Sequence, residues 1–210
     1  MSLRVYFLLN GKVQPVLRTV PQTKAVAGAA LNALLEGPTE AEKQIGLSTQ
    51  VPAESSLSVE KSGDVLKVQG DVPTGEPLAQ VVYTLTQFPS AQTVEVAGTK
   101  YTRGSFEDFT PAILVELPLP FQHVKGSLRL AGTANTFEAT FQYELKDASG
   151  KIVAKHFVTA SSGNGVRGTF DVQVAFTVSN AGQGTLTVYE NSAANGKRIN
   201  VVEIPLQLEH

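Results

Sequence analysis

The stretch TFEATFQYELKDASGKIVAKHFV, residues 136–158, decides the fold class of the second half of this 210-residue chain. Its apolar side chains share one parity and are Phe137, Ala139, Phe141, Tyr143 and Leu145. The other parity is mainly polar and carries Glu138, Thr140, Gln142, Glu144 and Lys146. A strand directs alternate residues to opposite faces, so we expect the aromatic residues to face a core and the acids to face water.

The sequence DASGK, residues 147–151, is predicted to be the hairpin turn that returns the chain as IVAKHFV. A calcium loop is the alternative, because Asp147 and Ser149 place oxygen atoms beside a glycine. The segment falls far short of the twelve-residue pattern with five or more ligands that such a loop requires. The turn is therefore the expected structure.

Similar segments recur through residues 112–208, where no helical periodicity is found. The strand candidates are AILVEL, SLRLAGTA, TFEATFQYELK, IVAKHFVTA, GTFDVQVAF, GTLTVYENS and RINVVEIPLQL. Turn-forming sequences separate them, including SSGNGVRG, SNAGQG and AANGK. About seven short strands in roughly 100 residues predict an immunoglobulin-like β-sandwich. The chain has no cysteine and no tryptophan, so packing alone would hold this sandwich together.

Residues 4–101 mix strand and helix signals and predict a small α/β sandwich with helices packed on a sheet. Asn10-Gly11 is typical of a type I′ hairpin turn, and a second hairpin is expected around Ser62-Gly63. Helical spacing predicts two apolar faces, one of Ala27, Ala30, Leu31, Leu34 and Leu35, the other of Leu78, Val81, Val82 and Leu85. Gly37 and Pro38 end the first helix, Thr39 and Glu42 have capping-box spacing, and Pro77 opens the second helix.

Residues 102–111, TRGSFEDFTP, change the composition and have no periodicity, so they are predicted to link the two domains. Phe106 and Phe109 within this linker are expected to pack against one or both domains, because a free linker gains nothing from two phenylalanines.

The composition is that of an ordinary globular protein, with 42% hydrophobic residues, 17% charged residues and a net charge of −2. No basic run is present to bind nucleic acid. The absence of cysteine excludes thiolate nucleophiles, disulfides and iron–sulfur clusters. The longest nearly apolar run, AVAGAALNALL, is too short to span a bilayer. The terminal sequences MSL and LEH resemble vector-encoded residues, so no role is expected for His210.

No catalytic or metal site is predicted. Glu138 and Glu144 stand about 20 Å apart along one strand, whereas glycosidase carboxylates stand about 5–9.5 Å apart. His123 and His156 have no partner at metal-binding spacing, and no G-x-S-x-G nucleophile motif occurs. The glycine-rich loop SSGNGVRG precedes a strand, so no helix N-terminus can hold a phosphate there. Arg167 in that loop is a candidate contact for an anionic partner, and we expect no cofactor.

The first half resembles the GerMN domain of bacterial sporulation and germination proteins in ALNALLEGPTEAEKQIGLSTQVPA and AQVVYTLTQFPSAQTVEV. The second half resembles the immunoglobulin-like domain that follows GerMN, in GTANTFEATFQYELKDASGKIVA, TASSGNGVRGTFDVQVAF and LTVYENSAANGKRINVVEIPL. Departures occur at Leu117 and Phe121, where a small residue and a turn glycine are expected, and at Asn195, where aspartate is more usual. The resemblance supplies no active residue.

The resemblance implies an extracytoplasmic protein of the cell envelope or the forming spore, often tethered to the membrane through an N-terminal anchor. It also implies envelope proteins or other copies of the chain as partners, with a ring or other oligomer as one form of assembly. The leading hypothesis is a non-catalytic protein that acts through protein–protein interaction or assembly. Alternatives are a peptidoglycan-binding or glycan-binding module, for which Tyr101, Phe121 and Tyr189 are the candidate contacts, and a cell-wall hydrolase.

Overall fold

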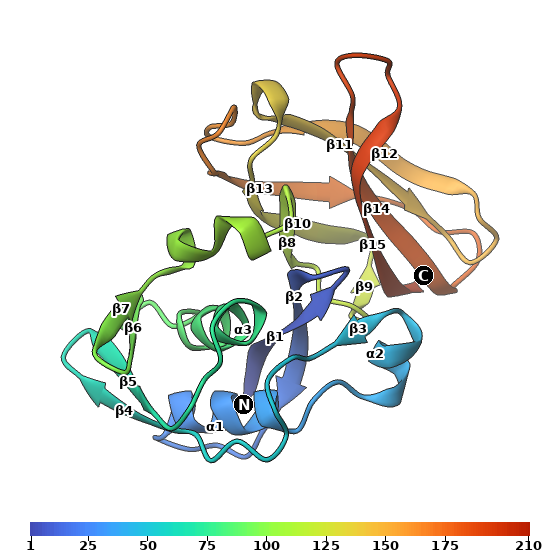
Figure 1. The fold of residues 1–210 in the computed structure, drawn as a ribbon. Coiled ribbons are helices and arrows are strands. Elements are labelled where there is room, and N and C mark those ends of the chain that lie inside the picture. Colours follow the sequence, from blue (N-terminus) through green and yellow to red (C-terminus); the bar gives the residue numbers. More distant parts are fainter. The chain divides into compact units, whose positions relative to one another are not determined.

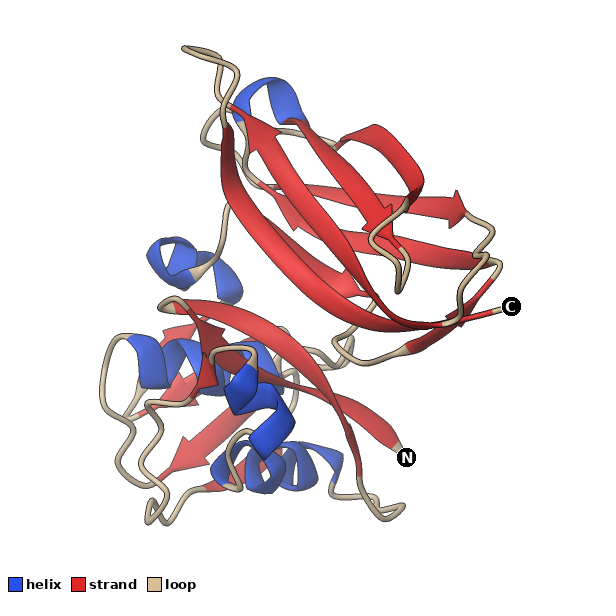
Figure 2. Ribbon diagram, turned by 90° about the vertical axis from the view of Figure 1, so that its right-hand side faces the viewer, coloured by secondary structure: helices blue, strands red, loops and turns tan.

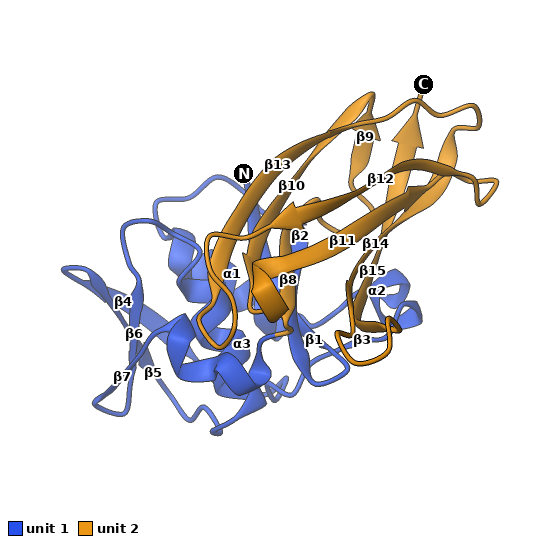
Figure 3. Ribbon diagram, turned by 90° about the horizontal axis from the view of Figure 1, so that it is seen from above, with its two compact units in different colours: residues 1–110 blue, residues 111–210 orange.

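A computed structural model describes all 210 residues, and the chain divides into two compact units, Met1–Thr110 and Pro111–His210 (Figure 3). Helices are concentrated in the first unit, whereas the second consists almost entirely of strands (Figure 2). No helix in either unit has both the length and the apolar character needed to cross a membrane.

The first unit contains short helices and two small sheets (Figure 1). One sheet has the order β2-β1-β3 and the other the order β4-β5-β6-β7. The strands are β1 (Ser2–Leu9), β2 (Lys12–Thr19), β3 (Leu47–Ser48), β4 (Ser58–Ser62), β5 (Val65–Gln69), β6 (Thr93–Val96) and β7 (Thr99–Tyr101). The helices are α1 (Val26–Leu35), α2 (Glu40–Gln44), α3 (Glu76–Leu85) and the 3-10 segment η1 (Arg103–Phe109). The predicted α/β sandwich is confirmed, with its strands divided between two sheets.

Local sequence signals explain several of these elements. The β1–β2 hairpin turns at Asn10-Gly11, both with positive φ. Thr39 and Glu42 form the predicted capping box at α2, and Gly37 follows α1 at φ 76°. The helix α3 is buried along nearly its whole length, and its fully buried Gln80 donates to the Tyr6 carbonyl at 3.1 Å. This bond ties α3 to β1.

Most of the predicted linker forms η1 (Arg103–Phe109), and its residues 102–110 belong to the first unit. Phe106 is 5% exposed and lies 5.7 Å from the Tyr101 ring. The Arg103 guanidinium lies over the Tyr83 ring at 4.8 Å, and Tyr83 Oη is 2.6 Å from Thr110 Oγ1. The boundary between the units therefore falls between residues 110 and 111.

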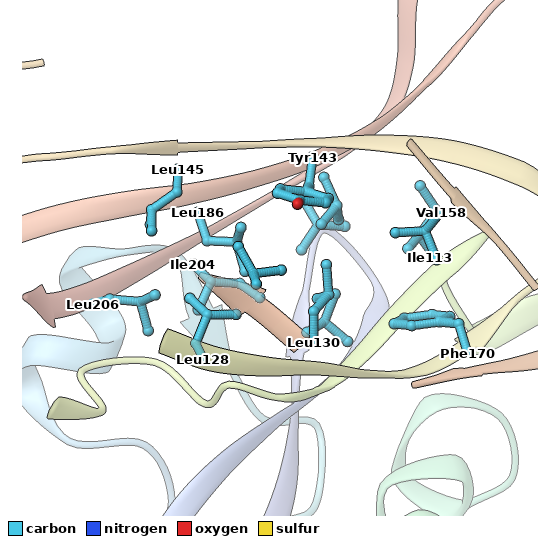
Figure 4. Packing of buried hydrophobic residues seen from close by; sticks show 14 of the residues in the cluster. Ile113, Leu128, Leu130, Tyr143, Leu145, Val158, Phe170, Leu186, Ile204 and Leu206 are labelled. Carbon is cyan, nitrogen blue, oxygen red and sulfur yellow. The ribbon is translucent and has the colours of Figure 1, made fainter. Parts of the chain in front are cut away.

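The second unit is a β-sandwich of eight strands, the seven predicted ones and the short β9. They are β8 (Ile113–Leu117), β9 (His123–Lys125), β10 (Ser127–Ala134), β11 (Thr140–Lys146), β12 (Ile152–Thr159), β13 (Gly168–Ala175), β14 (Gly182–Asn191) and β15 (Arg198–Glu209). The order is β12-β11-β14-β15-β9-β10-β13, with β8 on β10, and β9 pairs in parallel with the end of β15. The core lies between the two faces: Tyr143 and Leu145 stand opposite Leu128 and Leu130 (Figure 4).

One expectation about the opening stretch is wrong. The strand does not begin at Thr136, because residues Phe137–Ala139 form a 3-10 turn, η2, in which Glu138 and Ala139 have positive φ. Phe137 is consequently 55% exposed instead of facing the core. From Thr140 onward the predicted alternation is confirmed, with Phe141, Tyr143 and Leu145 in the core.

Candidate functional site

The outer face of the sheet β12-β11-β14-β15 carries the most organised polar cluster of the second unit, and Glu144 is its centre. Because Tyr143 and Leu145 point into the core, Glu144 points to the opposite face of β11. The sequence predicts that this acid faces water. The predicted face is correct, but the predicted contact with water is wrong, because Glu144 is only 2% exposed.

Neighbouring strands cover Glu144 with hydrogen-bond donors. Its Oε1 accepts from Lys155 Nζ at 2.8 Å, from Arg198 Nη2 at 2.6 Å and from the Tyr189 hydroxyl at 3.1 Å. The Arg198 guanidinium lies 4.0 Å from the centre of the Tyr189 ring, a cation–π distance, and so covers the tyrosine. Four residues from β11, β12, β14 and β15 are therefore joined at one oxygen atom.

The electrostatics follow from this geometry. The bond from Lys155 and those from Arg198 and Tyr189 outweigh the effect of burial and lower the pKa of Glu144 to about 2. In return, Glu144 raises the pKa of Lys155 and of Arg198. Lys155 and Arg198 carry two positive charges and Glu144 one negative charge, so the cluster has a net charge of +1. Its hydrogen bonds hold these side chains in place on the surface.

Exposed apolar side chains flank the cluster on the same face. Phe157 stands opposite Gln142 in the register, and Gln142 stands opposite Tyr189. Phe157 is 59% exposed. On β15, Val202 points into the core, so its neighbour Val201 points to the outer face, where it is 47% exposed. An arginine stacked on an aromatic ring between exposed apolar groups is the composition found at the centres of protein–protein interfaces.

Asp147, another acid of the opening stretch, has a structural role. Asp147 is 3% exposed, and its Oδ1 accepts from the amides of Ser149 and Lys151 and from Ser149 Oγ at 2.6 Å. These bonds, chiefly those of Ser149, lower the pKa of Asp147. They form the predicted hairpin turn between β11 and β12. Across the two units, no group of three or more histidine, aspartate or glutamate side chains is placed to hold a metal ion.

The four residues that the sequence singles out as contacts belong to different parts of the fold, with Tyr101 in the first unit and Arg167, Phe121 and Tyr189 in the second. Arg167 bonds to the Pro111 carbonyl at 3.0 Å and to Thr133 Oγ1 at 3.3 Å, so it ties its loop to β10 and to the start of the unit. Tyr101 packs on Phe106 in the other unit. Phe121 is 37% exposed in a turn with φ 64°, the conformation that explains why glycine is expected there.

Only Tyr189 belongs to the cluster, and it is 2% exposed. The Arg198 guanidinium packs on the Tyr189 ring and covers it, so this ring is not available to solvent. No sequence motif distinguishes Lys155, Phe157, Arg198 or Val201 from the other residues of their strands. Parity places the first two on the same face as Glu144, but only the pairing of strands shows that residues 144, 189 and 198 meet.

The first unit carries a cavity of about 760 Å³ beside the start of α1. Val59, Leu66 and Phe88 contribute apolar surface to its wall, and Lys24 and Lys61 are among its charged residues. No buried acid or histidine lines it, so its chemistry is that of an apolar surface groove.

Comparison with known proteins agrees with the two units. Residues 4–98 match the family described as sporulation and spore germination, and residues 112–197 match the family described as the immunoglobulin-like domain of bacterial spore germination. No curated protein matches the chain. A similar solved structure is CopC from Methylosinus trichosporium OB3b, at 14% identity over 44% of this chain and 86% of that chain, with a TM-score of 0.29. A likeness at this TM-score indicates nothing about the function of this chain.

Proposed function

Because the chain consists of a sporulation and spore germination domain followed by an immunoglobulin-like domain of bacterial spore germination, we propose that it serves sporulation or germination as a non-catalytic, extracytoplasmic binding protein. Its partner is another protein, and the outer face around Glu144 is the contact surface. The observation that carries this proposal is the Arg198–Tyr189 stack, held by a buried carboxylate between exposed Phe157 and Val201.

The state of Glu144 supports a binding role over a catalytic one. A general acid or base works best when its pKa lies near the operating pH. The pKa of Glu144 is about 2, and its Oε1 already accepts three bonds. The carboxylate is therefore suited to positioning Arg198 and Lys155, whose side chains are about half exposed.

The proposal is tested by complementation in a strain of the source organism that lacks the gene. Val201→Glu places a charge on the exposed apolar flank of the proposed surface and should reduce spore yield or germination rate toward the level of the deletion. Val166→Glu is the matched control, because Val166 is 64% exposed in the loop between β12 and β13. Equal complementation by both variants, each shown to fold by thermal denaturation, would contradict the proposed surface.

Self-association is one form of this function, in which the partner is a second copy of the chain. Light scattering after size-exclusion chromatography distinguishes this case. A mass that rises with protein concentration supports assembly, whereas a strict monomer at high concentration leaves only a different protein as the partner.

Glycan or peptidoglycan binding is the second candidate, and the exposed aromatic side chains favour it. Phe121, Phe137 and Phe157 are 37%, 55% and 59% exposed, and flat aromatic faces can stack on sugar rings. Sedimentation with purified cell wall tests this candidate. Protein that stays entirely in the supernatant excludes it, and wall binding that Phe137→Ala and Phe157→Ala weaken supports it.

A further inference from the structure

The strand β12 is an edge strand of the second unit's sheet. Its only strand partner is β11. The next backbone bond on its other side lies beyond the strand, between the Ser161 amide and the Thr169 carbonyl. The Phe157 amide donates to Nδ1 of its own neighbour His156 at 2.8 Å, so this N–H points away from β11. Because backbone direction alternates in antiparallel pairs, the backbone of Lys155 points the same way.

The usual protection of an edge strand is weak here. Natural edges are blunted by proline, by bulges or by lysines that extend over the edge. The sequence of β12, IVAKHFVT, contains no proline, and its register shift against β11 lies at Val153, beside the turn and away from Lys155 and Phe157. The Lys155 ammonium lies over the sheet, 2.8 Å from Glu144 Oε1, and Phe157 is 59% exposed. The imidazole of His156 is the one side chain bonded to an outward amide of this strand.

The charge of the edge indicates what it would accept. No acidic residue occurs on β12, which carries Lys155 and follows Lys151. The acid nearest to Lys155, Glu144, also binds Arg198 and Tyr189. A carboxylate on a partner chain, placed opposite Lys155, could therefore also bind the Lys155 ammonium. Glu144 would still be paired with Arg198 and Tyr189. Two copies of β12 joined edge to edge would bring basic strands together with no acid between them, so a second copy is a poor occupant.

We propose that the free edge of β12 binds an extended segment of a partner protein as an added strand, with a carboxylate opposite Lys155 and an apolar residue opposite Phe157. Backbone bonds to the added strand provide affinity, and the two side-chain pairs provide selectivity. The inference rests on the proposed function, because it names the chemistry of the partner at the border of the same surface.

Titration of the isotopically labelled protein with synthetic heptapeptides, followed by NMR, tests the inference. The acidic probe is acetyl-Thr-Val-Thr-Glu-Thr-Val-Thr-amide, whose glutamate can oppose Lys155 with a valine opposite Phe157 in either strand direction. It should shift the amide signals of residues 153–158. It should bind about three- to fivefold more tightly than the same peptide with lysine in place of glutamate. Methylation of the valine and glutamate amides should abolish binding.

Three variants sharpen the test. Lys155→Gln should reduce the preference for the acidic probe to less than about twofold, while Lys125→Gln, at an exposed position on β9, should leave it unchanged. His156→Ala frees the Phe157 amide and should tighten binding by about two- to fivefold. Equal binding of both peptides, or amide shifts confined to other strands, would overturn the inference. If the titration fails while Val201→Glu still impairs sporulation or germination, the edge inference is wrong and the proposed function stands.

Discussion

At the scale of single residues, Glu144 shows where sequence patterns stop being informative. Parity along residues 140–146 places it correctly on the outer face of β11. Its exposure depends on Tyr189 and Arg198, which lie 45 and 54 positions further along the chain. No local pattern identifies those partners, so a side chain expected in water is in fact buried under a cation and an aromatic ring.

Glu144 should give the second unit an acid-dependent stability. Its folded pKa is about 2 against an ordinary 4.5, so the stabilisation is fully present above about pH 5 and is lost as pH falls toward 2. Screening of its half-exposed partners reduces the contribution to about 1–2 kcal/mol. Glu144→Gln should therefore lower the free energy of unfolding at pH 7 more than at pH 2.5, as measured by urea denaturation. A difference from wild type that is the same at both pH values would contradict this role.

Replacement of Glu138, another acid of the same stretch, is expected to change the free energy of unfolding in the opposite direction. Glu138 is exposed and has φ 52°, a left-handed conformation that costs a non-glycine residue about 1 kcal/mol. Its backbone amide donates to Asn164 Oδ1, and a glycine keeps that bond. Glu138→Gly should raise the free energy of unfolding by about 0.5–1 kcal/mol, whereas Glu138→Ala should leave it nearly unchanged. The urea midpoint of each variant checks this expectation.

At the scale of elements, the late start of β11 has a long-range cause. The carbonyl of Thr136 accepts from the Asn164 amide, and the carbonyl of Ala139 accepts from the Ala160 amide. The Phe137 amide donates to Glu190 Oε1 at 2.8 Å. These bonds hold η2 against the loop between β12 and β13 and against β14. The sequence therefore predicts the strand but not its first four residues, because the competing partners lie more than 20 positions away.

The same loop makes one glycine indispensable. A Cβ on Gly163 would lie 2.5 Å from the Thr136 carbonyl oxygen and 2.6 Å from the Ala139 backbone, neither of which can move freely. Gly163→Ala should destabilise the second unit by about 1–3 kcal/mol. Gly28→Ala is the contrasting variant, since a Cβ there meets nothing within 4 Å on α1. It should stabilise the first unit by about 0.5–1 kcal/mol in calorimetry.

Capping and turn sequences predict the helix ends and hairpin turns of this chain most reliably. The Thr39 capping box, the Asn10-Gly11 hairpin and the DASGK turn depend on residues within four positions of one another, and each is confirmed. Such local bonds form wherever the flanking elements form. The cluster around Glu144 depends instead on the register of four strands, which parity alone does not specify.

At the scale of the whole molecule, the boundary at residues 110 and 111 predicts independent folding. Each unit has its own hydrophobic core, and η1 belongs to the first. Residues 111–210 expressed alone should unfold cooperatively and keep the acid-dependent difference between wild type and Glu144→Gln. Loss of that difference in the isolated unit would show that the cluster needs the rest of the chain.

Site-specific photo-crosslinking in sporulating or germinating cells would show whether the outer face around Glu144 contacts a partner protein. Benzoylphenylalanine would replace Phe157 or Val201 on this face, and Val166 in the loop between β12 and β13 as the matched exposed control. We expect one discrete crosslinked protein from positions 157 and 201 and none from position 166. No crosslinked protein at 157 and 201, or the same products from all three positions, would contradict it.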